Sequence, residues 1–241
     1  MTGAERGEFR VSERDGPARS VDDAIRTRAS IRAFLPRPVE EKVVRDILEV
    51  AARAPSGGNI QPWKVYVVAG EVRDRLVATV FEKAKTTPFG DGPWYDEFPK
   101  EMGEPFRARR RKVGFDLYAL AGVARDDMMG RARQGMKNFE FFGAPVGMFF
   151  TVEEQFGVAQ FVDLGMFLEN ICLLARARGL HTCPQEAWGL WHRTVSEFLG
   201  IPPKERMFCG LALGHPDWTD KVNALATERE SLENFARFEG F

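Results

Sequence analysis

The feature that most constrains the fold is the alternation of three short apolar runs with segments of helical spacing. The runs cover residues 64–69, 146–152 and 207–213 and are rich in β-branched, aromatic and other apolar residues, which predicts buried strands. Between them, residues 71–85 and 158–178 carry apolar side chains at the spacing of a helix face. Strands separated by helices predict a layered sheet with helices on both faces, although the irregular spacing does not give clean βαβ units.

Capping signals predict where several helices begin and end. Ser20 with Asp23, and Thr194 with Glu197, have the spacing of a capping box, in which two side chains satisfy the first free N–H groups of a helix. Gly179 follows the long helix over 158–178, at a position that favours positive φ.

Length and composition favour one globular domain. A chain of 241 residues corresponds to one large domain or to one domain with an additional segment. We expect a flexible arm over residues 1–19 without a secretory signal, and one domain over 20–241 that contains an inserted segment at 86–137. The extension over 215–241 has no core of its own, so we expect it to lie on a partner subunit. No apolar run reaches the ~20 residues that span a bilayer, which predicts no membrane partner.

The charge balance argues against a nucleic-acid partner. The chain has 34 basic and 35 acidic residues, a formal net charge of −1, and therefore no global field that would attract a polyanion. The run RARRRK at 107–112 is interpreted as a solvated helix face. The alternatives are a nucleic-acid patch and a site that attracts the phosphate groups of a small ligand.

The segment over residues 86–106 is too long and too apolar for a simple linker. Loops of this kind are usually lids or binding loops, so we predict a substrate lid. The alternative is that its aromatic residues only pack the insertion onto the sheet. These residues are Phe89, Trp94, Tyr95, Phe98 and Phe106.

Several kinds of catalytic site are excluded by the absence of their motifs. The chain has no G-x-G-x-x-G, no Walker A loop and no G-x-S-x-G. Its three cysteines lie far apart and no histidine has zinc-ligand spacing, so we expect no metal site and a reducing cytoplasm. Cys183 is interpreted as an inert buried thiol, with a nucleophile as the alternative.

Three loop segments carry the densest polar chemistry. In RTRASIRAF, Arg28, Ser30 and Arg32 alternate, so in an extended segment their side chains share a face and could hold a phosphate; a solvated basic turn is the alternative. In APSGGNIQPW, Gly57 and Gly58 let backbone amides approach a ligand. LHTCPQEAWG follows the long helix, and its aromatic surroundings could equally be core.

These segments, in this order and together with NFEFFGAPVGMFF and FCGLALGHPD, resemble the nitroreductase family of flavoproteins over roughly residues 20–240. The resemblance implies an α+β fold, a three-layer α/β/α sandwich with a central mixed sheet, in a domain-swapped homodimer that binds FMN at the interface. It implies the following FMN-binding residues: Arg28, Ala29, Ser30, Arg32, Pro55, Ser56, Gly57, Asn59, Asn138, Pro184, Gln185, Glu186 and Arg229.

The resemblance also implies a role for each group of residues. The segment around Ser30 would hold the FMN phosphate and ribityl chain, with Arg229 as a second phosphate contact, and residues 55–59 would come from the partner subunit. Residues 184–186 would lie along the isoalloxazine, with a backbone N–H of Gln185 or Glu186 toward N5 and with Asn138 at the pyrimidine edge. No catalytic acid or nucleophile is expected, because the flavin carries the hydride.

The function that the resemblance implies is an FMN-dependent oxidoreductase with NADH or NADPH as a transient donor. Its acceptors would be nitroaromatic, nitrofuran or quinone compounds, reduced by a ping-pong mechanism in the cytoplasm. Two alternatives remain open. One is a flavin enzyme of the same fold with another reduction, such as a reductive dehalogenase or an enone reductase, and the other is a non-catalytic flavin-binding module.

Overall fold

The computed structural model describes residues 14–241, and the first thirteen residues of the predicted arm lie outside this range. The remainder of that arm contacts the domain, since the Ala18 N–H donates to the Arg176 carbonyl at 2.9 Å. The helices and strands are α2 (Val21–Thr27), α3 (Glu41–Ala51), β1 (Lys64–Ala69), α4 (Gly70–Ala84), α5 (Phe106–Leu120), α6 (Met128–Met136), β2 (Val146–Glu153), α7 (Val158–Arg176), β3 (His181–Gln185), α8 (His192–Leu199), β4 (Glu205–Gly214) and α9 (Leu232–Phe235). Short 3-10 turns are η1 (Gly57–Asn59), η2 (Lys137–Gly143), η3 (Glu186–Trp191) and η4 (Lys221–Ala224).

The four strands form one sheet in the order β1-β2-β4-β3, and every neighbouring pair is antiparallel. The three predicted strands are confirmed as β1, β2 and β4. The predicted mixed sheet is found only in a limited sense, because the parallel pairing is a single isolated bridge between Ser30 and Thr182. β3 was predicted as a loop, and that prediction is wrong. A proline in a five-residue strand hides the strand signal, but an edge strand tolerates it.

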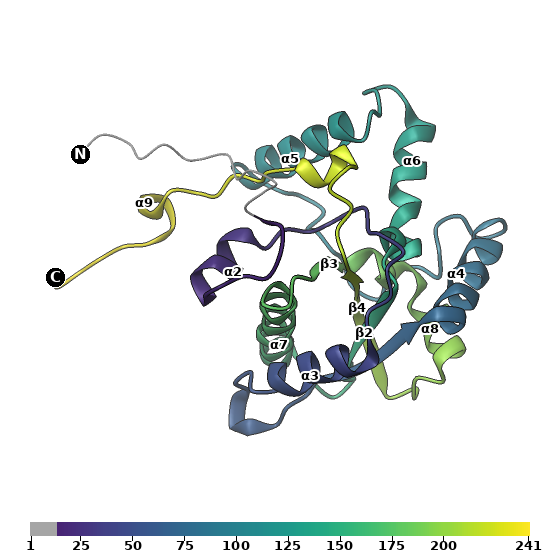
Figure 1. Ribbon diagram of the computed structural model, residues 1–241, viewed down its shortest axis with the longest axis horizontal. Helices are drawn as coiled ribbons and strands as arrows, with labels where there is room; N and C mark the ends of the chain where they lie inside the picture. The colour runs from purple at the N-terminus through teal and green to yellow at the C-terminus, as the bar shows by residue number, and fades with distance from the viewer. Residues whose placement is uncertain (1–13) are drawn as a thin grey trace.

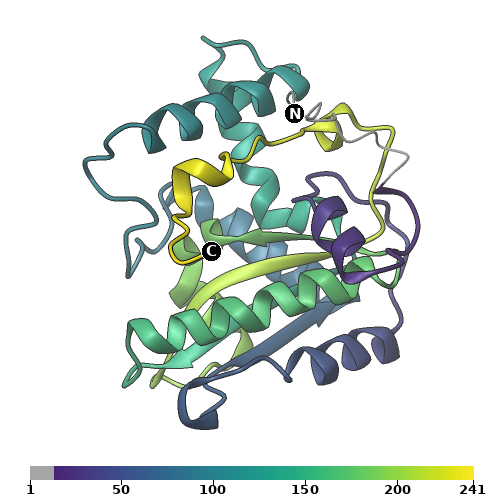
Figure 2. The same ribbon diagram turned by 90° about the vertical axis from the view of Figure 1, so that its left-hand side faces the viewer.

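Helices cover both faces of the sheet, as predicted (Figures 1 and 2). One hydrophobic cluster joins α3 and α7 to one face, through residues such as Met148 and Phe150 of β2. The other joins α4, η2, η3 and α8 to the opposite face, through Phe149. A β-bulge in β4 skips Phe208 in the pairing with β2, so that Met207 packs in the second cluster and Cys209 in the first.

The helix caps were predicted with mixed success. The Asp23 N–H donates to Ser20 Oγ at 3.1 Å, which confirms that cap, and Gly179 has φ +70° as expected. The capping box at Thr194 is wrong, because α8 already begins at His192. The Thr194 N–H instead donates to the Asp91 carboxylate at 2.7 Å, a contact with the insertion that local sequence does not reveal.

Some aromatic residues of the insertion pack it onto the sheet, and others are exposed. Trp94 Nε1 donates to the Met207 carbonyl at 2.6 Å and the Tyr95 hydroxyl donates to the Phe208 carbonyl at 2.8 Å, so these two rings fix the insertion to the bulge of β4. Phe89 is 86% exposed and has no such role. None of the residues of α5 is buried, and in Figure 2 this helix lies beyond the sheet layers.

Among residues 14–241, α7 is the one helix long and apolar enough to cross a membrane by composition, with a mean hydropathy of 1.5. A core helix of a globular domain passes the same test. Its buried side chains, such as Leu164 and Ile171, pack in the first hydrophobic cluster, whereas Val158 and Val162 are exposed.

Candidate functional site

The segment after α2 places its polar side chains on one face, as the sequence predicted. Ile31 is fully buried and Ala29 packs on the same cluster, while Arg28, Ser30 and Arg32 alternate with them and are half-buried. The segment is held beside β3, because the Ile31 N–H donates to the Thr182 carbonyl at 3.1 Å. The two arginines and the hydroxyl are therefore presented together at the open edge of the sheet.

Few internal partners neutralise these arginines. Arg28 Nε lies 3.5 Å from Glu169 Oε1, a pair whose carboxylate side chain is 51% exposed. Arg32 Nη1 donates to the Ser30 carbonyl at 3.2 Å. An exposed ion pair of this kind contributes little, so the guanidinium groups remain available to an anion.

Asn223 positions this segment and was missed by the sequence reasoning. It is 3% exposed, and its Oδ1 accepts from the Arg32 N–H at 2.8 Å. Its Nδ2 donates to the carbonyls of Ala33 and Asp217, both at 2.8 Å. No local pattern could have identified it, because its partners at positions 32 and 33 lie about 190 residues away along the chain.

Gln185 and Asn138, both predicted site residues, lie in contact. Gln185 Nε2 donates to the Asn138 carbonyl at 2.7 Å. The side chain of Gln185 is 2% exposed, and its Oε1 is buried without a hydrogen-bond partner. A buried amide oxygen without a partner is costly, which indicates a group that a ligand satisfies.

The residues on either side of Gln185 belong to the end of β3 and the start of η3. Pro184 is exposed on β3 and Glu186 begins η3. Although Glu186 is exposed, partial desolvation and then the nearby Glu97 carboxylate raise its pKa.

The loop over residues 55–59 contacts a different part of the molecule. The Gly57 N–H donates to Asp163 Oδ2 near the start of α7 at 3.3 Å, whereas Arg28 contacts Glu169 further along the same helix. Ser56 Oγ accepts from the Gln61 N–H at 3.0 Å, and Pro55 and Asn59 are exposed. Contacts within one chain therefore do not join this loop to the arginine segment.

Arg229 lies on the C-terminal tail. Its Nη1 donates to Thr227 Oγ1 at 2.8 Å and to the Glu228 carbonyl at 2.9 Å. The flanking acidic residues pair with α5, through Arg109 with Glu230 and Lys112 with Glu228. Within residues 14–241, these contacts commit Arg229 to its own segment rather than to Arg28 and Arg32.

The cysteines lie in the core. Cys183 is 2% exposed, which confirms that this thiol is buried, and burial raises its pKa to about 11. Cys172 and Cys209 are also buried and free. The part of the chain that the structure describes contains no group of three or more His, Cys, Asp or Glu that could hold a metal ion.

Comparison with known proteins identifies the family. The model of the nitroreductase family matches residues 25–215. A chloronitrobenzene nitroreductase of Comamonas testosteroni is 39% identical over 90% of this chain and 96% of its own length. A 4-nitrobenzoate reductase of Pseudomonas putida is 36% identical over 91% of this chain and 96% of its own length.

A solved structure agrees with these relatives. The FMN and NADPH-dependent nitroreductase NfnB of Sphigopyxis sp. strain HMH superposes with a TM-score of 0.89 and 40% sequence identity, over 92% of this chain and 100% of that one. The three-layer fold, the polar face beside β3 and these similarities lead to one conclusion: the chain belongs to the nitroreductase family of oxidoreductases.

Proposed function

We propose that the chain is an FMN-dependent reductase of nitroaromatic compounds that takes its electrons from NADH or NADPH. The relatives are named for nitroarene reduction, and the structural neighbour for its dependence on FMN and NADPH. The observation that carries the proposal is the edge of β3, where the half-buried face of Arg28, Ser30 and Arg32 lies beside Thr182.

The residues at this edge fit the chemistry of FMN. A phosphate needs several charged donors, which Arg28 and Arg32 supply, and guanidinium groups bind phosphates in a bidentate manner. The flavin ring is flat with a hydrogen-bonding edge, which suits the buried pair of Gln185 and Asn138 and the oxygen of Gln185 that lacks a partner.

When bound, FMN supplies the hydride transfer from the nicotinamide donor to the acceptor. The chain's own residues bind the cofactor, orient it and shield it from solvent. In a strand, the N–H and C=O of one residue point to the same side, and the Thr182 carbonyl points away from β4 toward Ile31. Pro184 has no N–H, β3 ends at Gln185 and η3 begins at Glu186. We propose that the Glu186 N–H is the backbone donor from which a ring acceptor atom would accept a hydrogen bond.

We further propose nitrofurans and quinones as additional acceptors and ping-pong kinetics. Donor and acceptor would use the same cleft in turn. Because no dinucleotide-binding fingerprint holds the donor, it can leave after each transfer.

A homodimer in the cytoplasm completes the proposal. Val158, Val162 and Gly165 form an exposed stripe along α7, apolar at two of its three positions, that would bury against a second copy. The tail carries Phe235, Phe238 and other exposed apolar residues and extends past α5 away from the sheet (Figure 1). A partner's loop over residues 55–59 would then close the site that one chain leaves open.

The decisive experiment is flavin content after purification. We expect a yellow protein whose absorbance bleaches anaerobically with NADPH or NADH and recovers on addition of 4-nitrobenzoate or chloronitrobenzene. Replacing both Arg28 and Arg32 by alanine should release FMN, whereas Arg26→Ala, an exposed arginine of α2, should retain it. A colourless protein that takes up no FMN contradicts the proposal, and recovery with halogenated acceptors alone would favour a dehalogenase.

A further inference from the structure

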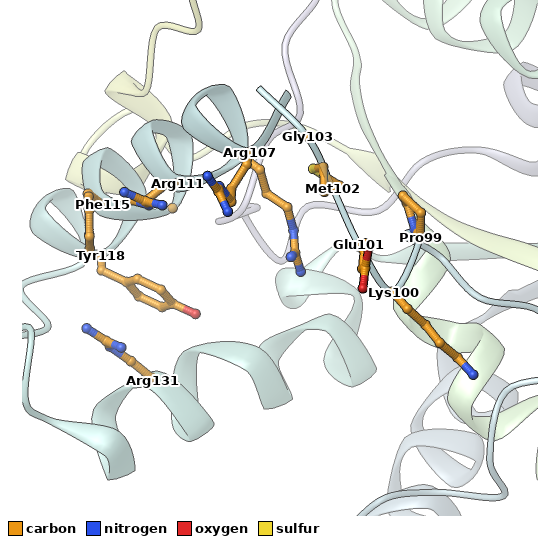
Figure 3. Close-up of a pocket in the computed structure, with 12 residues that line it drawn as sticks. Pro99, Lys100, Glu101, Met102, Gly103, Arg107, Arg111, Phe115, Tyr118 and Arg131 are labelled. Atoms are coloured by element: carbon orange, nitrogen blue, oxygen red, sulfur yellow. The ribbon is translucent and has the colours of Figure 1, made fainter. Parts of the chain in front are cut away.

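The insertion contains a pocket that the proposed flavin site does not explain. It has a volume of about 980 Å³ and lies between residues 99–103, α5 and α6 (Figure 3). Five cations line it, against a single carboxylate, that of Glu101. The cations are Lys100, Arg107, Arg110, Arg111 and Arg131. Such an excess of positive charge in one concave site focuses a field on an anion.

The two faces of α5 differ in how their charges are compensated. On one face, Arg109 and Lys112 pair with glutamates of the tail. On the pocket face, Arg107 pairs with Glu104, and that pair is more than half exposed. Arg131, from α6, donates through Nη2 to the Arg125 carbonyl, whereas its buried Nε has no hydrogen-bond partner. A buried guanidinium nitrogen without a partner is costly, so a ligand in the pocket that accepted from it would be stabilised.

Aromatic rings form the rest of the wall. Phe115 and Tyr118 line the pocket beside the arginines. The guanidinium of Arg131 lies 5.3 Å from the ring centroid of Tyr118, and that of Arg110 lies 3.9 Å from the ring centroid of Phe98. Stacked arginines and aromatic rings bind flat heteroaromatic groups that carry phosphate.

The pocket lies next to the edge proposed to hold the flavin. The Tyr95 ring lies against Gly189 of η3, because a Cβ at Gly189 would be 3.5 Å from Tyr95 Cε1. Further along the same segment, Phe98 stacks on Arg110 of the pocket. Residues 95–103 therefore lead from η3, which begins at Glu186, to the pocket wall. A ligand with one end at Glu186 could place its other end among the arginines.

We propose that this pocket binds the adenosine 2′-phosphate of NADPH and so makes the enzyme prefer NADPH over NADH. The inference rests on the proposed function and deepens it. A 2′-phosphate carries about −1.5 to −2 charges and three acceptor oxygens, which match several guanidinium groups, and the adenine matches the aromatic wall. A carboxylate acceptor such as nitrobenzoate would need only one arginine, so five cations favour the phosphate.

The first test measures binding directly. Adenosine 2′,5′-bisphosphate is titrated into the yellow holoenzyme by calorimetry, with 5′-AMP as the ligand that lacks the 2′-phosphate. We expect the bisphosphate to bind at least about tenfold tighter than 5′-AMP, and the Arg107→Ala/Arg111→Ala variant to lose about tenfold or more of that affinity. Arg133→Ala, on α6 but outside the pocket, is the matched control. Equal affinity for the two ligands, or equal loss in the control, overturns the inference.

The second test uses steady-state kinetics. The double variant should raise the KM for NADPH by about tenfold and change the KM for NADH by less than about threefold. Glu101→Gln removes the single carboxylate of the pocket and should lower the KM for NADPH, which keeps the inference testable if the double variant does not fold. A rise in the KM for the nitroarene with no change for NADPH assigns the pocket to the acceptor and overturns the proposal.

Failure of the inference can be told from failure of the proposed function. A yellow enzyme that reduces nitroarenes but fails both tests overturns the pocket assignment alone. A protein without flavin overturns the function, and binding of the bisphosphate can still be measured on it.

Discussion

Lowering the pH from 7 to 5 should destabilise the protein through His181, which begins β3. The imidazole is 1% exposed, and its Nε2 lies 3.0 Å from the Arg14 carbonyl. Burial first, and then the nearby Arg176 guanidinium, lower the pKa of His181 from 6.5 to about 3. The ring also packs edge-on against Trp218, with centroids 5.2 Å apart.

The size of the effect follows from linkage. Between pH 7 and 5 the unfolded histidine takes up about 0.7 of a proton, while the folded one stays neutral, so the folded state loses stability as the pH falls. With pKa values of 6.5 unfolded and about 3 folded, the free energy of unfolding drops by about 2 kcal/mol. The figure barely changes for any folded pKa below about 4, because the folded state binds few protons at pH 5 in either case.

The assay compares the chain with His181→Gln by urea denaturation at pH 7 and pH 5. Gln keeps a donor for the Arg14 carbonyl but does not titrate. Protein and FMN concentrations are fixed, because both binding and association change the apparent stability. His192 and His215 also have lowered pKa values, through burial, and they contribute equally to both proteins. If the variant loses as much stability between the two pH values as the original chain, the reasoning is refuted.

Three substitutions test other parts of the structure. Gly210→Ala would place a Cβ 2.3 Å from Trp188 Cδ1, and we expect a loss of about 1–3 kcal/mol in a urea titration; an unchanged midpoint would contradict this packing. The Asp91 carboxylate is 3% exposed and lies 3.0 Å from Lys83 Nζ, and Asp91→Asn weakens this contact. We therefore expect a loss of about 1–3 kcal/mol in the free energy of unfolding and faster proteolysis within residues 86–105. Equal cleavage rates would show that the insertion is fixed elsewhere. Val162→Asp places a charge on the exposed stripe of α7, and sedimentation should show a dimer weakened by about tenfold or more; an unchanged dimer would exclude this stripe as the interface.

Elements with strong local periodicity could be predicted from the sequence. β1 and α7 were found at almost their observed bounds because their apolar residues repeat at the strand or helix period within one short segment. β3 was missed because Pro184 weakens its local signal, while its pairing with β4 depends on residues about 30 positions away.

Some features of the candidate site could likewise be predicted from the sequence, and others could not. The shared face of Arg28, Ser30 and Arg32 was predicted, because alternation with Ala29 and Ile31 is a local property of an extended segment. The contacts that fix this segment were not predicted, since they come from β3 and from the region around η4.

The sequence by itself determined the layering of a sheet with helices on both faces and the polar face of residues 28–32, since periodicity acts between near neighbours in the chain. The α+β class followed from the family resemblance. Only the tertiary structure decided where α8 begins, which side chain holds Arg32, and that cations of three separate segments line one pocket. Hydrogen bonds and charges act over a few ångströms of space, whatever the distance along the chain. A residue such as Asp91 or Arg131 therefore acquires its role only when folding brings its partners or its pocket to it.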